Sequence, residues 1–485
     1  MPDNYDSSNK YPGVVIFHGF SASKEMLRPF TEEFAKNNFI ALTVDDIGAG
    51  ESSPGLGENA SLLSTGLIAL NYLASRYDVD SSKIGLFGHS MGGSIVLETA
   101  SNSNIPKVNV VLGNPIDESQ LEFTHLNTTN PRNLLVGVGK YDELVSLDAT
   151  KKNLASITGG DPSIKENVLY GDFASGTARK LIAPKTDHIL EILNPQIIEE
   201  SVKWMILGLG LNQSPLVNGI SHSFHQALTV ITYALVLASV IALSVNPIDW
   251  SRQNTHTGIP IKWHGLFSLA GFIFGAIFMN LLPVIFLGLF IGWFLFTSTL
   301  YAIYNMRRKG IELSTIVSKF TNLSEYGKGL AILTAVFAIF EIIFYYVPWD
   351  LRYAIPLLAY IPPLRIFAIM IPVLICGTIL FEMDQMTLKE PDESYFESSM
   401  NTFWARSWPF IIILLIYYVP LITGMSRLPD ILGFLTFFIV GFVPIIFALT
   451  FITEYPQFKH RSTLTGSIIA AGFLAWVLAA TLPIS

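Results

Sequence analysis

Gly88-His89-Ser90-Met91-Gly92 is the stretch of this chain that decides the fold. It follows a short apolar run at 84–87, which is typical of a buried strand, and it precedes a helix-like run at 93–100. The glycines permit a turn in which backbone and neighbouring side chains approach closely, because they lack a Cβ. Such a turn lifts the serine hydroxyl out of the sheet edge, so Ser90 is a candidate nucleophile.

Two further turns follow apolar strands earlier in the chain. The strand predicted at 14–17 ends in His18-Gly19-Phe20, and the strand predicted at 40–44 ends in the polar stretch 45–52. With the turn around Ser90, these motifs resemble those of α/β-hydrolases over residues 11 to about 205, and especially those of serine aminopeptidases, esterases and monoacylglycerol lipases. The resemblance implies a mostly parallel sheet flanked by helices. The motif residues that carry it are His18, Gly19, Asp46, Gly88, His89 and Gly92.

The resemblance also implies that an acid and then a histidine follow Ser90 in the chain. A serine hydroxyl becomes a good nucleophile only when a base takes its proton, and a carboxylate holds that imidazole in one tautomer. Asp142 lies on the loop after the strand predicted at 133–139, in the setting where the family carries its acid. Glu143 is the neighbouring alternative.

The predicted base is His188, which follows the last predicted strand at 179–183. The family keeps its histidine at this place. His18 and His89 belong to motifs and precede their turns, and His125 lies in a polar loop, so these three are weaker candidates.

Two backbone N–H groups have to bind the negative charge that develops on the substrate oxygen. By resemblance these are the amides of Met91, directly after the nucleophile, and of Phe20. The pair Asp45-Asp46 is interpreted as structural, because no His or Cys ligand accompanies it. The sequence therefore predicts no metal and no cofactor.

The chain departs from the family in two respects. The first strand matches the third strand of a full α/β-hydrolase, so the leading strands are missing. Either the sheet is minimal with an unusual edge, or the sequence begins inside a longer protein. The interval 112–132 is too short for a separate cap domain, so the site is open to solvent or something else covers it.

Composition changes abruptly after residue 212. Residues 1–213 contain 25 of the 38 acidic residues and 16 of the 30 basic residues, and the rest is apolar and aromatic. We therefore predict a hydrolase domain over 1–212 and a helical membrane domain over 213–485. Apolar runs of about twenty residues are typical of bilayer spans. Eight are expected, with seven to nine as the range: 224–245, 263–282, 284–304, 328–347, 363–382, 407–423, 431–452 and 465–484.

Lysine and arginine are distributed unevenly among the expected loops. The loops on one face of the predicted bundle carry 11 of them, and the opposite loops carry three. Basic loops are usually cytoplasmic, which predicts a multi-pass cell-membrane protein with its hydrolase domain outside. The alternative is a cytoplasmic hydrolase domain, with a membrane topology opposite to the one that the loop charges predict.

The apolar segment 351–358 is short and flanked by prolines, so an interfacial or re-entrant position is expected.

The favoured function is a membrane-bound serine hydrolase that cleaves an ester or other acyl bond. The expected partners are an acyl-containing small molecule, lipid or peptide and the lipid bilayer, with no prediction of oligomeric state. A serine peptidase is the enzymatic alternative. A transporter or sensor with a hydrolase-like binding module is the alternative from another class. Nucleic-acid binding is not supported, because the net charge is -8 and no basic stripe appears.

Overall fold

The chain divides into two compact units. The sheet unit contains residues 1–220, and the helical unit contains most of the described residues from 261 onward. The computed structural model describes residues 1–52, 61–122, 125–159, 163–220, 261–279, 284, 286–346, 361, 363–388, 395–423, 430–460 and 463–482.

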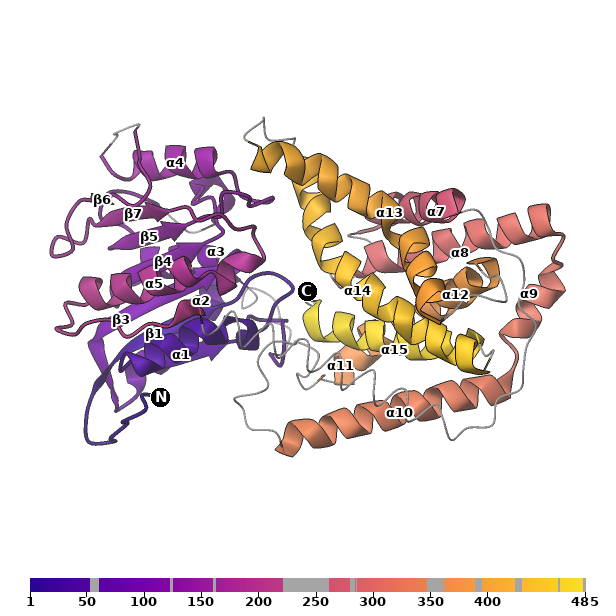
Figure 1. The fold of residues 1–485 in the computed structure, drawn as a ribbon. Coiled ribbons are helices and arrows are strands. Elements are labelled where there is room, and N and C mark those ends of the chain that lie inside the picture. Colours follow the sequence, from indigo (N-terminus) through magenta and orange to yellow (C-terminus); the bar gives the residue numbers. More distant parts are fainter. Residues whose placement is uncertain are drawn as a thin grey trace. The chain divides into compact units, whose positions relative to one another are not determined.

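The sheet unit is built on a mostly parallel sheet. Among the described residues the sheet has seven strands in the order β2-β1-β3-β4-β5-β7-β6 (Figure 1). All neighbouring strands run parallel except β6, which is antiparallel to β7. The strands are β1 Tyr11–Phe17, β2 Ile40–Val44, β3 Val79–His89, β4 Pro106–Leu112, β5 Leu134–Gly137, β6 Leu169–Tyr170 and β7 Arg179–Ile182.

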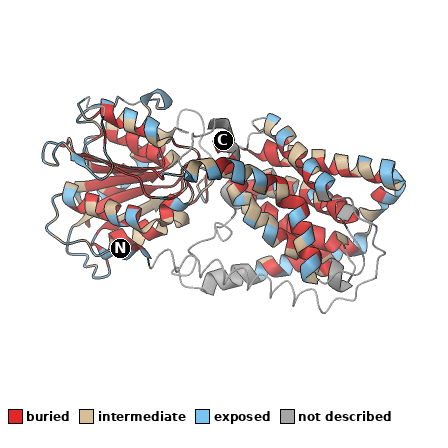
Figure 2. Cartoon of the chain, turned by 45° about the horizontal axis from the view of Figure 1, so that its top comes forward, coloured by how far each residue is buried: buried red, intermediate tan, exposed pale blue. Residues whose placement is uncertain are grey.

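Helices cover both faces of this sheet and bury two separate apolar clusters. Successive side chains of a strand point to opposite faces. Accordingly, Val15 of β1 packs with α2, α3 and α4, whereas Ile16 packs with α1 and α5. Figure 2 shows the strands buried between these helices. The helices and short 3-10 turns are η1 Lys24–Leu27, α1 Arg28–Lys36, α2 Leu62–Ser75, α3 Met91–Ser101, η3 Glu118–Gln120, α4 Leu147–Ser156, η4 Leu190–Leu193 and α5 Pro195–Gly208.

The strands are longer or shorter than the apolar runs that predict them. β1 begins at Tyr11 rather than near Val14, and Tyr11 pairs with Val79 across a shift in register. β3 continues through the solvent-exposed residues 80–83, which an apolar pattern cannot reveal. β6 has only two residues and was not expected. Between β4 and β5 the described residues form one 3-10 turn, η3.

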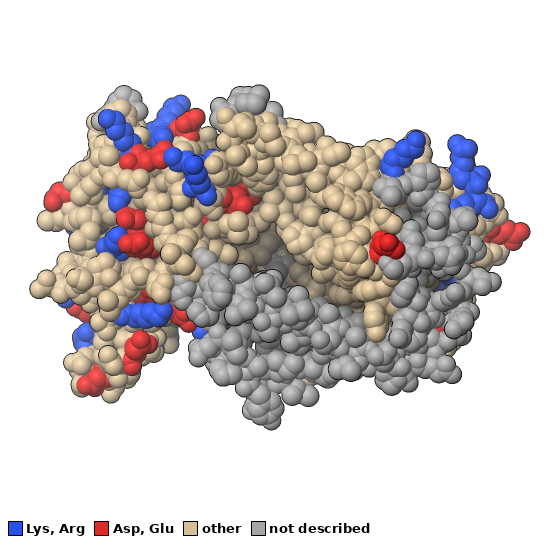
Figure 3. All heavy atoms as spheres, in the orientation of Figure 1, with Lys and Arg blue, Asp and Glu red and all other residues tan. Residues whose placement is uncertain are grey.

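The helical unit packs its helices in pairs. α8 packs against α7 and α12, α15 packs against α12 and α10, and α13 packs against α7. On the face drawn in Figure 3, charged side chains of both signs are scattered over the sheet unit, whereas the described surface of the helical unit is mostly uncharged. The elements are α7 Ile261–Ile277, α8 Leu287–Lys309, α9 Leu313–Lys319, α10 Leu323–Tyr346, α11 Pro363–Arg365, the π-helix η7 Ile366–Met370, α12 Ile371–Leu388, α13 Tyr395–Ile422, α14 Asp430–His460 and α15 Thr463–Thr481.

Four of the described helices are long and apolar enough to cross a membrane. The four segments are Leu287–Lys309, Pro363–Met386, Tyr395–Ile422 and Ile439–Pro456. The expected span 224–245 and the segment 351–358 lie outside the described residues. The expected spans at 263–282, 328–347 and 465–484 overlap α7, α10 and α15, respectively.

Helix α13 differs most from its expected span. It begins at Tyr395, twelve residues before the predicted start at 407, and it contains the buried Arg406, which the charge count assigned to a loop. The helix begins earlier than the hydropathy pattern predicts because its first turns are polar but buried. The first turns of α13 bury Ser398 and Thr402, whose hydroxyls bond to the Glu454 carboxylate, so polar residues lie inside the bundle. A hydropathy pattern interprets such residues as a loop.

The closeness of Gly92 to strand β1 generates a stability prediction. A Cβ at Gly92 would lie 2.3 Å from the Phe17 carbonyl oxygen. We expect Gly92→Ala to destabilise the sheet unit by about 1–3 kcal/mol, because overpacking a tight site forces the backbone to move. Denaturant unfolding would measure the loss. Ser101→Ala, at the other end of α3, should change stability by less than about 0.5 kcal/mol, and an equal loss in both variants would contradict the steric argument.

Candidate active site

Ser90 is the single residue between strand β3 and helix α3. Its φ of 56° and ψ of -119° are unusual for a residue with a side chain and cost conformational energy. Two glycines make the turn possible: a Cβ at Gly88 would lie 2.1 Å from the Gly92 carbonyl oxygen. The Asn114 amide donates to the Ser90 carbonyl at 3.1 Å and to the Ser94 hydroxyl at 3.0 Å. The turn therefore holds the Ser90 hydroxyl at the carboxyl end of the sheet.

The structure brings Ser90, His188 and Asp142 together from three loops. The Ser90 hydroxyl lies 3.0 Å from Nε2 of His188, and Nδ1 of His188 lies 2.8 Å from the Asp142 carboxylate. The other Asp142 oxygen accepts N–H groups from Leu144 and Val145, at 2.8 and 2.7 Å. With Nδ1–H donated to Asp142, Nε2 is free to accept the proton of Ser90. This arrangement can activate a hydroxyl as a nucleophile.

Burial and charge set the protonation of this pair. Asp142 is 1% exposed and His188 is 2% exposed. Burial disfavours the charged form of Asp142, but the His188 imidazole and the Val145 N–H outweigh it and hold the pKa of Asp142 below its usual value. Burial is the largest single influence on His188 and lowers its pKa, but the charge and hydrogen bond of Asp142, with the charges of Glu143 and Asp187, together outweigh burial and raise the pKa of His188 above its usual value. An ionised carboxylate therefore faces an imidazole of increased basicity.

Glu143, the alternative acid, contacts the backbone of His188 instead of its ring. Its carboxylate accepts the His188 N–H at 3.2 Å. Burial and the neighbouring Asp142 charge raise the pKa of Glu143 to about 7. Of the two adjacent acids, only Asp142 has a described bond to the imidazole ring.

The predicted oxyanion donors lie on either side of Ser90. Met91 begins helix α3, so its amide is among the N–H groups at the helix N-terminus that have no partner inside the helix. Phe20 follows Gly19, where an added Cβ would lie 3.0 Å from the Ser90 Cβ. The turn before Phe20 therefore runs against the nucleophile.

His18 supports this turn rather than facing Ser90. Its Nδ1–H donates to the Gly19 carbonyl at 2.7 Å, and its Nε2 accepts the Asp46 N–H at 3.1 Å. The Asp46 carboxylate is buried 3.7 Å from the imidazole, and burial raises the pKa of Asp46 to about 6. His18 and Asp46 thus connect the β1 and β2 turns.

Asp45 organises the loop after β2, a role that sequence reasoning did not assign. Its carboxylate accepts the Lys24 backbone N–H at 2.9 Å, the Lys24 ammonium at 2.5 Å and the Glu51 N–H at 3.0 Å. Only the two consecutive aspartates at 45–46 could have indicated this role of Asp45.

His125 takes no part in the contacts around Ser90: it is exposed and bonds to Glu118.

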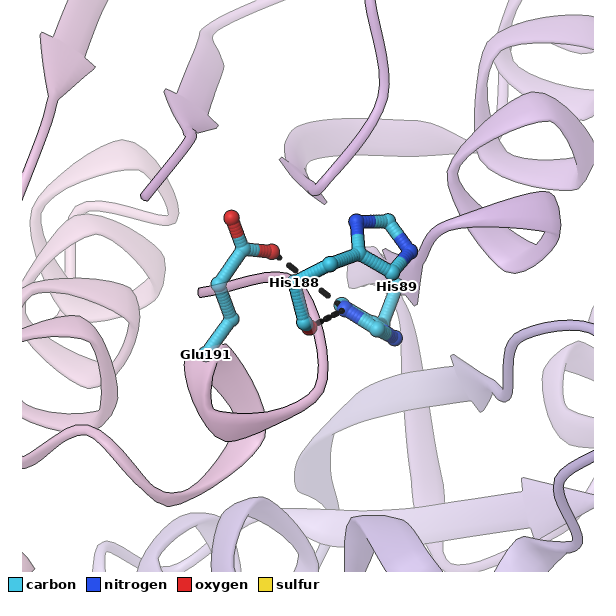
Figure 4. A group of neighbouring side chains, drawn as sticks. All are labelled: His89, His188 and Glu191. Atoms are coloured by element: carbon cyan, nitrogen blue, oxygen red, sulfur yellow. Dashed lines mark hydrogen bonds and ion pairs between the residues drawn. The ribbon is translucent and has the colours of Figure 1, made fainter. Parts of the chain in front are cut away.

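Glu191 is a second buried residue that the sequence did not reveal. One of its oxygens accepts the Gly139 N–H at 2.5 Å, and the other lies 3.3 Å from Nε2 of His89. His89 in turn donates to the His188 carbonyl at 3.1 Å (Figure 4). Burial and the Asp142 charge raise the pKa of Glu191 well above its usual value. Glu191 therefore joins the loops that carry Asp142, Ser90 and His188.

Within the described part of the chain, His89, His188 and Glu191 form the one group with donor atoms close enough to share a metal ion, all within 4.8 Å of one another. Both ring nitrogens of His188 already face Asp142 and Ser90. A metal could bind His188 only by breaking one of these bonds. The donor set therefore fits a hydrogen-bonded network better than a metal centre.

Comparisons with known proteins match parts of the chain. Residues 10–135 match the family model described as serine aminopeptidase, S33. An uncharacterised 31.7 kDa protein of Escherichia coli is 32% identical over 95 residues, which are 19% of this chain and 33% of the relative. Cutinase 1 of Thermobifida cellulosilytica is 28% identical over 94 residues, 19% of this chain and 36% of the relative.

Among solved structures, the esterase Pf2001 of Pyrococcus furiosus is 19% identical, with a TM-score of 0.33, and the match covers 42% of this chain and 84% of that one. The chain spans about a third of the length of the first curated relatives it matches. The family match and the parallel sheet with its flanking helices support an α/β-hydrolase fold for the sheet unit.

The bond between Glu191 and Gly139 leads to a second prediction. In Glu191→Leu the buried Gly139 N–H loses its acceptor, which should cost about 1–3 kcal/mol of unfolding free energy. Glu191→Gln keeps an acceptor oxygen and matches the neutral acid, so its loss should be smaller. Denaturant unfolding of the two variants checks this order, and equal losses would show that the acceptor is not what matters.

Proposed function

We propose that the sheet unit is a serine hydrolase that cleaves an ester or other acyl bond. The observation that carries this proposal is the continuous hydrogen-bonded chain from the Ser90 hydroxyl through His188 to Asp142, with bonds of 3.0 and 2.8 Å. The three side chains come from separate loops, and the imidazole is oriented so that Nε2 is available as a base. The match to a hydrolase family model supports the same assignment.

Each residue of the site has a separate role in the proposed reaction. Ser90 Oγ attacks the substrate carbonyl carbon while His188 takes its proton, and Asp142 stabilises the imidazolium that forms. The amides of Met91 and Phe20 bind the oxyanion. His188 then protonates the leaving group, which departs and leaves an acyl group on Ser90. Water, deprotonated by His188, attacks this acyl-enzyme, and Ser90 recovers its proton as the acid leaves.

A carboxylic ester is the favoured substrate class, with an acyl-containing small molecule or lipid as the molecule that carries it. Two similar proteins are named cutinases, which supports ester cleavage. The description of the matching family as serine aminopeptidase supports a peptide substrate as the second candidate. Both reactions use the same residues, and the chemistry requires no cofactor.

We also infer that the helical unit is embedded in a lipid bilayer, with the sheet unit outside the cytoplasm. Four apolar helices of sufficient length support insertion. The excess of lysine and arginine in one set of expected loops supports the orientation. Arg406 was counted among the basic loops and Arg365 among the opposite loops, but both are buried in helices. Without these two residues, the first set of loops still carries far more lysine and arginine than the second.

The decisive test is covalent labelling of the detergent-solubilised full chain with a fluorophosphonate, which reacts with activated serines. We expect labelling at Ser90, none in Ser90→Ala, and a rate reduced about a thousandfold or more in His188→Ala, because the base is lost. Ser81→Ala, at an exposed position of β3, is the control and should label normally. Folded protein that does not label would favour a transporter or sensor in which the sheet unit is a binding module.

The position of Glu143 generates a prediction of pH dependence. The reaction needs neutral His188, so kcat/KM should fall as pH decreases through the pKa of His188, which is raised from its usual value. The Glu143 charge contributes to raising that pKa. Because the pKa of Glu143 is itself about 7, this acid is ionised only near and above neutral pH. Glu143→Gln removes that partial charge, lowers the pKa of His188 slightly and should move the acid limb of the profile slightly to lower pH.

The profile is measured as kcat/KM for an activated ester between acidic and neutral pH. Glu118→Gln, which changes an acid on the distant exposed turn η3, is the control and should leave the profile unchanged. An acid limb that stays in place or moves to higher pH in Glu143→Gln would refute the electrostatic argument.

A further inference from the structure

The helical unit contains a cavity of about 50 Å³ between its helices. All four helices that are able to cross a membrane line it, together with α7 and α15. Its walls are mostly aromatic and aliphatic. The polar residues that also line it are Ser268, Thr297, Tyr301, Asp384 and Arg406. An apolar pocket between helices with a few convergent polar groups is the usual form of a small-molecule site.

The polar groups at this cavity form one buried network. Asp384 accepts from the guanidinium of Arg406 and pairs with Nε2 of His264, and Tyr301 bonds to the same imidazole at 2.9 Å. The third nitrogen of Arg406 donates to Thr450 at 2.9 Å. Each of these side chains is at least nine-tenths buried. Ionisable groups within a bilayer are costly, and their presence there usually marks a functional site.

Trp293 of α8 supplies an independent observation. It lines the cavity and is 6% exposed, and among the described residues its indole N–H has no hydrogen-bond acceptor. Its ring is held in place by Phe272, Phe410 and Phe442, with centroid distances of 5.4, 5.7 and 5.8 Å. The indole N–H of Trp293 can therefore donate a hydrogen bond to a ligand in the cavity that carries an acceptor oxygen.

We propose that this cavity binds the carbonyl end of an acyl lipid. The carbonyl oxygen accepts the Trp293 N–H, and the first carbons of the chain contact the neighbouring aromatic and aliphatic side chains. The residues that line the cavity all belong to the helical unit, and the proposal does not depend on the hydrolase activity.

The chemistry of the walls favours an acyl group over water. A cavity needs only about 10–15 Å³ to hold one water, so this one has room for several non-hydrogen atoms. A buried water requires two to four polar partners. The Tyr301, Asp384 and Arg406 groups already bond to one another or to His264 and Thr450. The Ser268 and Thr297 hydroxyls also line the cavity, but most of its wall is apolar, so a single acceptor attached to hydrocarbon fits it better than a cluster of waters.

The probe is a saturated fatty acid whose chain carries a diazirine and an alkyne, used alongside its methyl ester. Full-length Ser90→Ala protein in detergent is irradiated with either probe, so that no ester is hydrolysed, and the labelled peptides are identified. We expect labelling in α8, α12 and α14. Labelling by both probes identifies the shared carbonyl as the recognised group, whereas labelling by one alone identifies the free acid or the esterified lipid as the source.

Two variants test the role of the indole donor. Trp293→Phe keeps an aromatic ring and removes only the N–H, so half-saturation should require about fivefold more probe, the effect of losing one hydrogen bond. Trp404→Phe removes the same group from an exposed position and should leave labelling unchanged. Unlabelled fatty acid should compete, and an alkane of equal length should not.

Filling the cavity provides a test that does not rely on Trp293. Leu449 lines the cavity and is buried, so Leu449→Phe should abolish most labelling of the three helices. Undiminished labelling in Leu449→Phe, equal affinity in Trp293→Phe, effective competition by the alkane, or no labelling by either probe would each overturn the proposal. Circular dichroism of each variant confirms that the helices are retained.

Discussion

The hydrogen bond between the His188 imidazole and the Asp142 carboxylate is the interaction on which the proposed chemistry of the sheet unit depends. It fixes the tautomer that leaves Nε2 facing the Ser90 hydroxyl. It also stabilises a charge that would be costly in this buried position without a partner. The Leu144 and Val145 N–H groups hold the carboxylate from its other side. The loop after β5 is thus shaped around an ionised acid.

The need to pair a buried charge also applies to the helical unit. Asp384 is paired with Arg406, and the Glu454 carboxylate accepts hydrogen bonds from Gln385, Ser398 and Thr402. Breaking one partner of such a buried pair leaves an uncompensated charge. These contacts join α12, α13 and α14, helices whose apolar surfaces alone give little directional preference. The polar contacts therefore specify which helix faces meet.

Local sequence predicts much of the sheet unit. The turn at Ser90 follows from glycine spacing between a strand and a helix, and Asp142 and His188 follow from their positions after predicted strands and from the family resemblance. Their convergence depends on strand order, which places the carboxyl ends of β3, β5 and β7 at one edge of the sheet. No local pattern encodes that order, so the convergence of the three side chains could be expected only from the family resemblance.

Other features had no local signal. Glu191 lies in a short turn that resembles many surface turns, and its partner Gly139 is distant in sequence. Arg406 was assigned to a loop because a hydropathy pattern treats charge as a sign of exposure, whereas the structure buries it against Asp384. In both cases the stabilising partner lies on another element. Burial of a charged residue is predictable only once that partner is known.

The contacts of Glu191 have a consequence for motion in the sheet unit. Its carboxyl group touches the loop after β5 and the residue before the nucleophile, and it lies three residues after the imidazole. None of these loops can open without breaking a contact to this one side chain. Segments tied in this way unfold together as a cooperative unit. Backbone amides across the site should therefore share one free energy of opening, so that the nucleophile, base and acid lose their arrangement together.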